Sequence, residues 1–279
     1  MKTVMTTAVF GYDLPYEQNI RRLAAAGFDG IDLCIGNQSP LYGAEWEAYA
    51  KLLRDTASEV GAACTHSHLP DIHVLSPETF AAAFRGLAAC GVGCTVIHPI
   101  WMQNEKVIHD EDEFFSLNLP LYKTLLGAAE KYGIKILCEN LLWGPSLDPV
   151  VMSKLQDELN SPFFGWCFDV GHANVFDITA ADLIGLNAPH SLHIHDNHGG
   201  KEGDRERRHA SMYTDEHLLP YDGSINWMAF ARALHDIGYQ GDFVLEATTS
   251  TSVKGDDIDA RMKELYDRAL RIRAMIPVE

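Results

Sequence analysis

The stretch Phe164–His172, FGWCFDVGH, begins as an apolar run, reaches a carboxylate at Asp169 and turns through Gly171 into His172. An apolar run of this length is typical of a strand that is buried on both faces. Asp169 and His172 would then stand together at the mouth of the strand, as two side chains able to bind a metal. The alternative is that Asp169 caps the next helix and His172 lies in its first turn. This stretch alone does not separate the two interpretations.

The rest of the chain repeats the same unit, an apolar run of strand length followed by a segment of helical composition. The other predicted strands are Val4–Phe10, Gly30–Ile35, Ala63–His68, Cys94–Ile100, Lys135–Asn140, Ser191–Asn197 and Asp242–Ala247. The predicted helices are Tyr16–Ala26, Glu45–Val60, Pro77–Cys90, Asp112–Tyr132, Asp148–Leu159, Ala180–Leu186, Trp227–Ile237 and Asp257–Met275. Eight such alternations in 279 residues predict an α/β fold, a (β/α)8 TIM barrel in one domain over residues 1–279. The GxGxxG pattern of an open dinucleotide-binding sheet does not follow the first strand.

Composition excludes some partners. The net charge is 22 − 39 = −17, which repels phosphate backbones and disfavours nucleic acid as a substrate. No segment approaches the roughly 18 apolar residues that a membrane span needs. The N-terminal residues lack the apolar core and the cleavage site of a signal peptide, so we expect a cytoplasmic protein without a membrane partner.

Histidines and carboxylates stand at the ends of six predicted strands. They are His66 and His68, His98, Glu139, Asp169 with His172, His193 with His195 and Asp196, and Glu246. In a barrel these ends converge on one face, where active sites are built. A carboxylate in an apolar strand is costly unless it is paired or bound to a metal. The alternative for Glu139 and Glu246 is a hydrogen bond to a neighbouring loop, but the whole set favours a site for Mn²⁺, Zn²⁺, Mg²⁺ or Co²⁺.

The motifs LCENL, FDVGH, HIHDN, DEHL with GSINW, and VLEAT, in this order, resemble the xylose isomerase-like barrels. That family includes sugar phosphate isomerases and epimerases and, more distantly, nucleases of the endonuclease IV type. The resemblance implies metal ligation by Glu139, Asp169, His193 and Glu246, and a substrate contact by His172. The nuclease branch further implies a histidine on the third strand, either His66 or His68, and additional ligands at His98, Asp215 and His217. Ketose 3-epimerases carry a second Glu six residues after the first, where this chain has Pro145.

Other side chains near the predicted mouth could bind substrate. Trp101 and Trp143 could stack on a sugar face or simply cover the barrel. The loop that contains Lys201, Arg205, Arg207 and Arg208 also holds Glu and Asp, so it is either a solvated loop or a clamp for a phosphate or carboxylate. We therefore count His66, His98, Trp101 and Arg205 as candidate substrate-binding residues.

The favoured function is a metal-dependent isomerase or epimerase of a small sugar, sugar phosphate or inosose. Proton abstraction next to a carbonyl would give a metal-stabilised enediolate, with Glu139 and Glu246 as catalytic acid and base and His172 beside the substrate. A dehydratase on this scaffold would share the first step. The alternative is a multi-metal phosphodiesterase of the endonuclease IV type, and a non-catalytic sugar-binding barrel ranks last. The sequence leaves homo-oligomerisation open.

Overall fold

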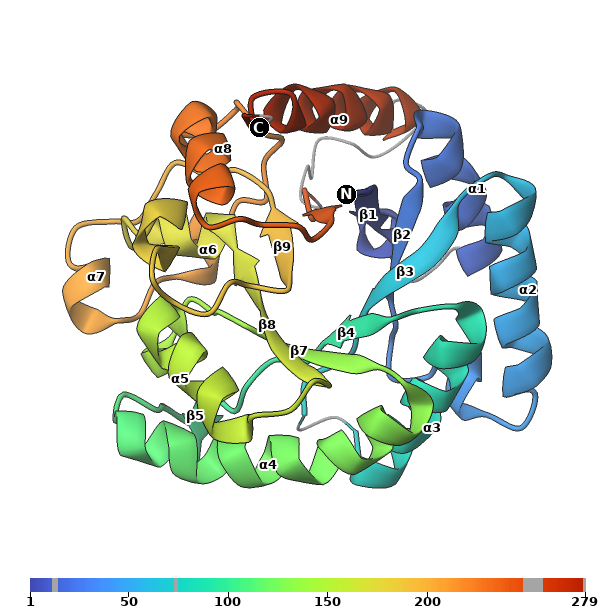
Figure 1. The fold of residues 1–279 in the computed structure, drawn as a ribbon, viewed down its shortest axis with the longest axis horizontal. Coiled ribbons are helices and arrows are strands. Elements are labelled where there is room, and N and C mark those ends of the chain that lie inside the picture. The colour runs from blue at the N-terminus through green and yellow to red at the C-terminus, as the bar shows by residue number, and fades with distance from the viewer. Residues whose placement is uncertain (12–14, 73–74, 248–257, 278–279) are drawn as a thin grey trace.

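The computed structural model describes residues 1–11, 15–72, 75–247 and 258–277, and of Arg205 the backbone only. Within them, eight parallel strands close into a barrel in the order β1-β10-β9-β8-β7-β4-β3-β2 (Figure 1). The strands are β1 (Thr3–Thr6), β2 (Gly30–Cys34), β3 (Ala63–His68), β4 (Cys94–Val96), β7 (Lys135–Glu139), β8 (Phe164–Asp169), β9 (Ser191–Ile194) and β10 (Phe243–Leu245). The predicted fold class is confirmed.

Helices form a ring outside the strands, as the view down the barrel shows (Figure 1). They are α1 (Tyr16–Ala26), α2 (Trp46–Glu59), α3 (Pro77–Cys90), α4 (Glu111–Tyr132), α5 (Pro149–Leu159), α6 (Val170–Val175), α7 (Asp204–Arg207), α8 (Trp227–Asp236) and α9 (Ile258–Arg273). Short 3-10 helices cover Thr7–Phe10, Pro40–Tyr42, Gly144–Leu147, Ala180–Leu183 and Met212–Thr214. No helix in the described part of the chain is long and apolar enough to cross a membrane.

Local signals in the sequence set the ends of these helices. The Ser76 hydroxyl accepts the backbone N–H of Thr79 at the start of α3, Pro77 occupies the first turn, and Gly91 ends the helix in the left-handed conformation. The Asp110 carboxylate likewise accepts the N–H of Glu113 at the start of α4. These caps satisfy backbone groups that a helix end leaves without partners.

The core has two layers, as expected for a parallel sheet that is covered on both faces. Every residue of β8 is buried. Cys94, Val96, Leu137 and Cys167 cluster together inside the barrel. A larger cluster, which includes Trp166 and Phe168, joins the barrel to the helices. Successive side chains of β8 point alternately into the two layers, and both layers are buried. This is why the strand appears in the sequence as a continuous apolar run.

Several predicted elements differ from the structure. The strand predicted over Val4–Phe10 is wrong beyond Thr6, whose side chain accepts the N–H of Ala8 and starts a 3-10 helix. The predicted helix Ala180–Leu186 is a shorter 3-10 helix. Strands β4, β9 and β10 end earlier than predicted, and the last residues of each predicted strand lie in the loop that follows it. Helix α6 matches the alternative in which Asp169 caps a helix, whereas α7 and the hairpin of β5 (Met102–Gln103) and β6 (Lys106–Val107) were not predicted. Asp257 lies outside the described residues.

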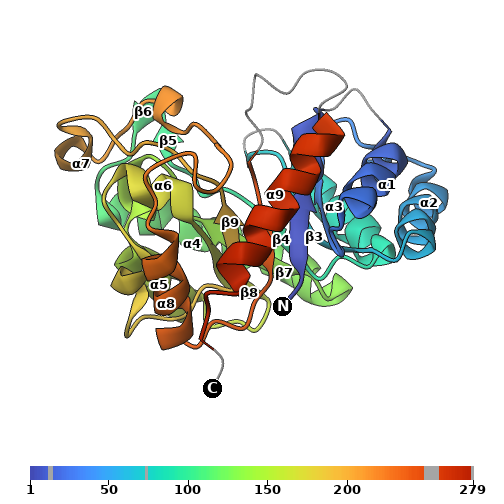
Figure 2. The same ribbon diagram turned by 90° about the horizontal axis from the view of Figure 1, so that it is seen from above.

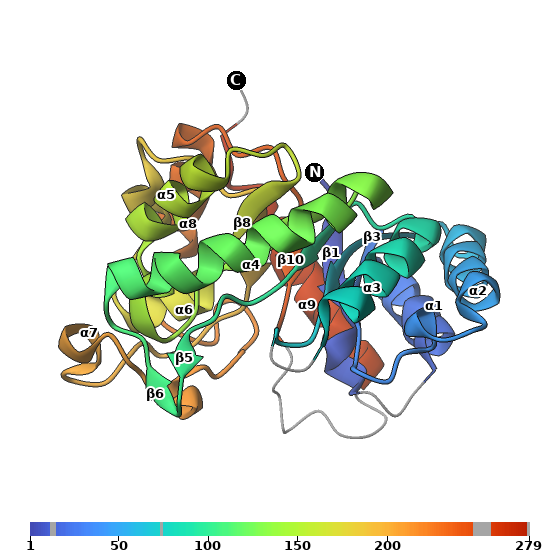
Figure 3. The ribbon, with the colours of Figure 1, turned by 90° about the horizontal axis from the view of Figure 1, so that it is seen from below.

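Two side views separate the ends of the barrel. The N-terminus and the C-terminal end of α9 lie at one end, and the β5–β6 hairpin and α7 lie at the other (Figures 2 and 3). The second end carries the loops that follow the carboxyl ends of the strands, which is where active sites of these barrels are built.

Candidate metal centre

Three groups of histidine and carboxylate side chains lie at the carboxyl ends of the strands, and within each group the candidate ligand atoms are within 4.8 Å of one another. The central group is Glu139, Asp169, His193 and Glu246; the β4 group is His68, His98 and Glu139; the loop group is His172, His195, Asp215 and His217. They border a cavity of about 990 Å³. Glu139, Glu246 and members of the other two groups contribute to its lining.

The central group brings together the four residues that the family resemblance implied as ligands. His193 Nδ1 lies 2.8 Å from Glu139 Oε1, 2.8 Å from Glu246 Oε2 and 3.9 Å from Asp169 Oδ2. Burial alone raises the pKa of Glu139, but His193, His68 and His98 hold the pKa of this carboxyl well below its usual range. Burial also raises the pKa of Glu246, and His193 outweighs it and lowers that pKa to about 2. Glu246 is therefore an anion that also lines the cavity.

The β4 group shares Glu139 with the central group. While Oε1 faces His193, Oε2 lies 3.3 Å from His68 Nε2 and 3.2 Å from His98 Nε2. Burial lowers the pKa of His98, but hydrogen bonds to Asp71 and Glu139 raise it to about 9. Both oxygens of Glu139 are thus engaged by imidazoles.

The third strand resolves the choice between His66 and His68. His68 joins the β4 group and lines the cavity, and His66 is not among the residues that line it. Residues two apart on a strand share a face but differ in depth by about 7 Å. His66 Nδ1 bonds Thr65 Oγ1 at 2.9 Å, and burial lowers the pKa of His66 to about 4. Of the two candidates, His68 is thus the one that lies at the cavity, and a substrate contact by either residue stays a prediction.

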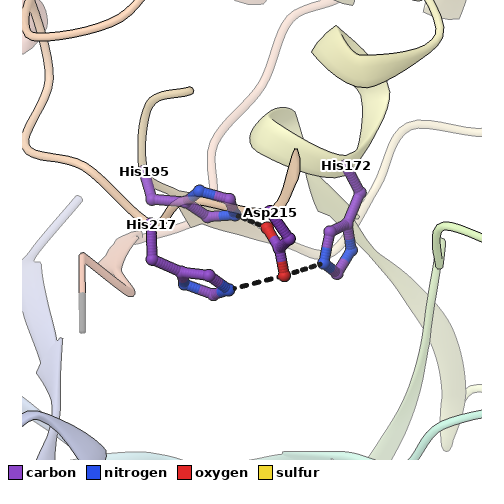
Figure 4. Close-up of side chains that lie close together, drawn as sticks. All are labelled: His172, His195, Asp215 and His217. Atoms are coloured by element: carbon purple, nitrogen blue, oxygen red, sulfur yellow. Dashed lines mark hydrogen bonds and ion pairs between the residues drawn. The ribbon is translucent and has the colours of Figure 1, made fainter. Parts of the chain in front are cut away.

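The loop group centres on Asp215 (Figure 4). Asp215 Oδ2 lies 3.2 Å from His172 Nε2 and 2.8 Å from His217 Nε2. Burial alone raises the pKa of Asp215, but these two imidazoles hold it well below its usual range. Of the additional ligands that the nuclease branch implied, Asp215 and His217 thus lie together with His195 beside them, whereas His98 belongs to the β4 group.

Four histidines of these groups share one arrangement. Each directs Nδ1 to an oxygen that is not a candidate ligand atom and directs Nε2 into a group. The Nδ1 partners are Leu69 O at 3.0 Å for His68, Asp71 Oδ1 at 2.7 Å for His98, Asn140 O at 2.8 Å for His172 and Glu246 O at 2.6 Å for His217. Histidines that bind metals almost always donate their other N–H in this way. Together with the carboxylates, and with no thiolate in any group, this donor set fits a divalent ion.

The sequence interpretation gave no role to two residues that hold the site in place. Asn140 pairs with the backbone of Asp169 in both directions, at 3.0 and 2.7 Å. Asp196 accepts hydrogen bonds from Tyr221 N at 2.9 Å and Trp227 Nε1 at 3.0 Å, so it organises the loop after β9. The motifs LCENL and HIHDN contain both residues, each next to or near a ligand.

The remaining substrate candidates are placed differently. Trp101 stacks on Trp143 with ring centroids 4.3 Å apart, and Trp143 lines the cavity while Trp101 lies behind it. The side chain of Arg205 lies outside the described residues. Arg207 and Arg208 pair with Asp204 and Asp148 instead of entering the cavity. Among the described lining residues there is no Lys or Arg, so Arg207 and Arg208 favour the solvated loop over the anion clamp that was its alternative.

Comparisons with known proteins agree with this fold. A protein of Methanocaldococcus jannaschii, the uncharacterized protein MJ1311, is 28% identical over 186 residues, which are 63% of this chain and 57% of that protein. The aligned part thus spans little more than half of this relative. The 3-keto-D-glucoside 4-epimerase YcjR of E. coli is similar in structure, with a TM-score of 0.72, 14% identity and coverage of 97% and 99% of the two chains. The IOLI protein with a binding zinc atom has a TM-score of 0.73 at 15% identity, covering 99% and 98%. The model of one family matches residues 20–271, nearly the whole chain, and on that match the chain belongs to the xylose isomerase-like TIM barrel family.

Proposed function

We propose that this protein is a divalent-metal-dependent isomerase or epimerase of a small, sugar-like carbonyl compound. The observation that carries the proposal is the central group, a set of carboxylates and one imidazole at the cavity with Glu246 on its lining. Similar folds in proteins named as sugar epimerases add support. The described cavity lining has no Lys or Arg side chain, which favours a substrate without a phosphate.

Glu139, Asp169, His193 and Glu246 would hold the ion. When bound there, a divalent ion supplies a Lewis acid for a carbonyl oxygen and so acidifies the neighbouring C–H. Glu246 would remove that proton, because it lines the cavity while both oxygens of Glu139 face imidazoles. Glu139 is therefore a weaker second base than the sequence suggested. A single base on one face gives isomerisation more directly than epimerisation, which needs a proton donor on the opposite face.

Deuterium exchange tests the reaction. The metal-loaded protein in D₂O, incubated with ketoses, inososes and their phosphates, should exchange the C–H next to the carbonyl of its substrate, as seen by NMR. Glu246→Gln should abolish the exchange. A protein with verified metal content that exchanges no member of the panel would contradict the proposal.

A second candidate function is a multi-metal phosphodiesterase. It is favoured by one observation, that Glu139 is shared by two groups and a third group lies beside them. Paired metal ions can stabilise both the attacking and the leaving oxygen of a phosphodiester. The net charge of −17 disfavours a nucleic acid, so its substrate would be a small diester.

The pair Asp215→Ala and His217→Ala separates the two functions. In a single-metal isomerase, the double variant should keep one tightly bound ion and a measurable rate of C–H exchange. In a multi-metal hydrolase, loss of two ligands should remove a whole ion per chain and end hydrolysis. Metal analysis of the unmutated and the double-variant chains, with both assays run on each, distinguishes these outcomes.

A further inference from the structure

His195 follows β9 and points between two of the groups. The side chain is fully buried, and its Nε2 lies 3.0 and 3.2 Å from the two carboxylate oxygens of Asp169 and 3.6 Å from Asp215 Oδ1 (Figure 4). From these distances alone, Nε2 could either bind an ion or donate a hydrogen bond to Asp169.

The other ring nitrogen distinguishes the two roles. The four histidines with an anchored Nδ1, namely His68, His98, His172 and His217, each place an oxygen at that atom. In the described structure, Nδ1 of His195 is buried and has no hydrogen-bond partner. An imidazole that binds an ion through Nε2 carries its proton on Nδ1, and a buried N–H without an acceptor costs about 1–3 kcal/mol. With the proton on Nε2, the ring donates to Asp169, and only a lone pair is left unpaired.

We propose that His195 is a positioning residue that donates its Nε2–H to Asp169 and is not itself a metal ligand. The Oδ1 atom of Asp169 also accepts the backbone N–H of His172 at 2.7 Å. With Oδ1 held by two donors, Oδ2 is directed towards His193 of the central group, 3.9 Å away. The inference rests on the proposed metal centre and adds the residue that orients one of its carboxylates.

Packing fixes the ring of His195 from both sides. The ring of His217 stacks on it with centroids 3.9 Å apart and an interplanar angle of 9°. On another side lies Gly171, where an added Cβ would overlap three atoms of the His195 ring. Gly171 does not have a positive φ, so the fold requires glycine there for space and not for backbone conformation. The glycine of FDVGH therefore makes room for His195.

Three variants test the assignment. His195→Phe keeps an aromatic ring against His217 and removes the donor, His195→Gln restores an N–H at about the same reach, and Gly171→Ala displaces the ring without changing any ligand. His235→Phe, on α8 and away from the three groups, is the matched control. For each we would measure Co²⁺ bound per chain at saturation, Co²⁺ affinity by competition with a chelator, and the visible spectrum of bound Co²⁺.

Loss of a ligand-orienting partner lowers metal affinity about 10- to 100-fold. His195→Phe and Gly171→Ala should show such a loss with the number of ions and the Co²⁺ spectrum unchanged, and His195→Gln should recover most of the affinity. If His195→Phe does not fold, the Co²⁺ affinities of the other two variants are compared. Gly171→Ala should then bind Co²⁺ more weakly than His195→Gln.

Loss of a whole ion in His195→Phe would overturn the proposal, as would unchanged affinity or failure of Gln to restore it. An unmutated chain that binds no divalent ion would refute the proposed function as well. If the unmutated chain binds its ion and the variants bind it with the same affinity, only the role of His195 is refuted.

Discussion

In the multi-metal alternative, binding of a divalent ion at the β4 group should depend steeply on pH. His98 Nε2 faces this group, and the hydrogen bonds of His98 to Asp71 and Glu139 outweigh burial and raise its pKa to about 9. At pH 7, two units below this pKa, the imidazole is almost fully protonated, so an entering ion must displace the proton at a cost of about 3 kcal/mol. Because a raised pKa favours the proton, affinity should fall as the pH drops below 9. Between pH 7 and 8 the affinity should rise about 10-fold, and above pH 9 it should level off.

Asp71→Asn isolates this effect because it removes a negative charge from His98 Nδ1 and leaves every ligand in place. The variant should bind the ion less tightly at pH 9.5, because its imidazole is a weaker ligand, but should show a flatter pH dependence. Calorimetric titration with Zn²⁺ in two buffers of different ionisation enthalpy counts the protons released. We expect fewer protons per chain from Asp71→Asn at pH 7. An affinity that does not change between pH 7 and 9, or an equal slope in both proteins, would refute the reasoning.

Three further predictions concern single residues. Glu246→Gln should leave the barrel folded and lower turnover at least about 100-fold, as loss of a general base does; a near-normal rate at normal metal content would contradict its role. In the folded protein the pKa of His66 is about 4, so as the pH falls the unfolded chain takes up a proton before the folded chain does, and the free energy of unfolding should fall by about 2 kcal/mol from pH 7 to 5. Urea titrations should show that His66→Gln lacks this part of the pH dependence. An equal pH dependence in both proteins would contradict the prediction. Asp196→Ala should reduce the free energy of unfolding by about 3 kcal/mol, since it strands the Trp227 indole N–H and backbone donors; a loss under about 1 kcal/mol would show that other groups take over.

The two interpretations of Phe164–His172 are both present in the structure. Asp169 Oδ1 accepts the N–H of His172 and so caps α6, while Oδ2 faces the central group. A carboxylate has two oxygens with several lone pairs, so one side chain can start a helix and still take part in a metal group. The strand pattern could not separate these roles because they do not exclude each other.

The sequence by itself determined the barrel and a shared site at its strand ends, and the resemblance to the xylose isomerase-like barrels supplied the four residues of the central group. Parallel strands covered on both faces must be apolar throughout, so each strand stands out, and a carboxylate at its end is conspicuous. Since all strand ends of a barrel meet on one face, the positions of Glu139, Asp169, His193 and Glu246 in separate strands predicted a shared site. The order of the strands and the amphipathic helices between them are local properties of the chain.

Only the tertiary structure decided how the side chains divide the work. It selected His68 over His66, because the two residues share a face and differ only in depth along the strand. It also made Glu139 a member of two groups, through contacts with His193 and His68 that are 54 and 71 residues away in the chain. Differences of an ångström between such distant residues depend on strand register and packing, which the periodicity of the sequence does not specify. The sequence also could not show that the buried Nδ1 of His195 lacks a hydrogen-bond partner, because this is visible only when every neighbour is in place.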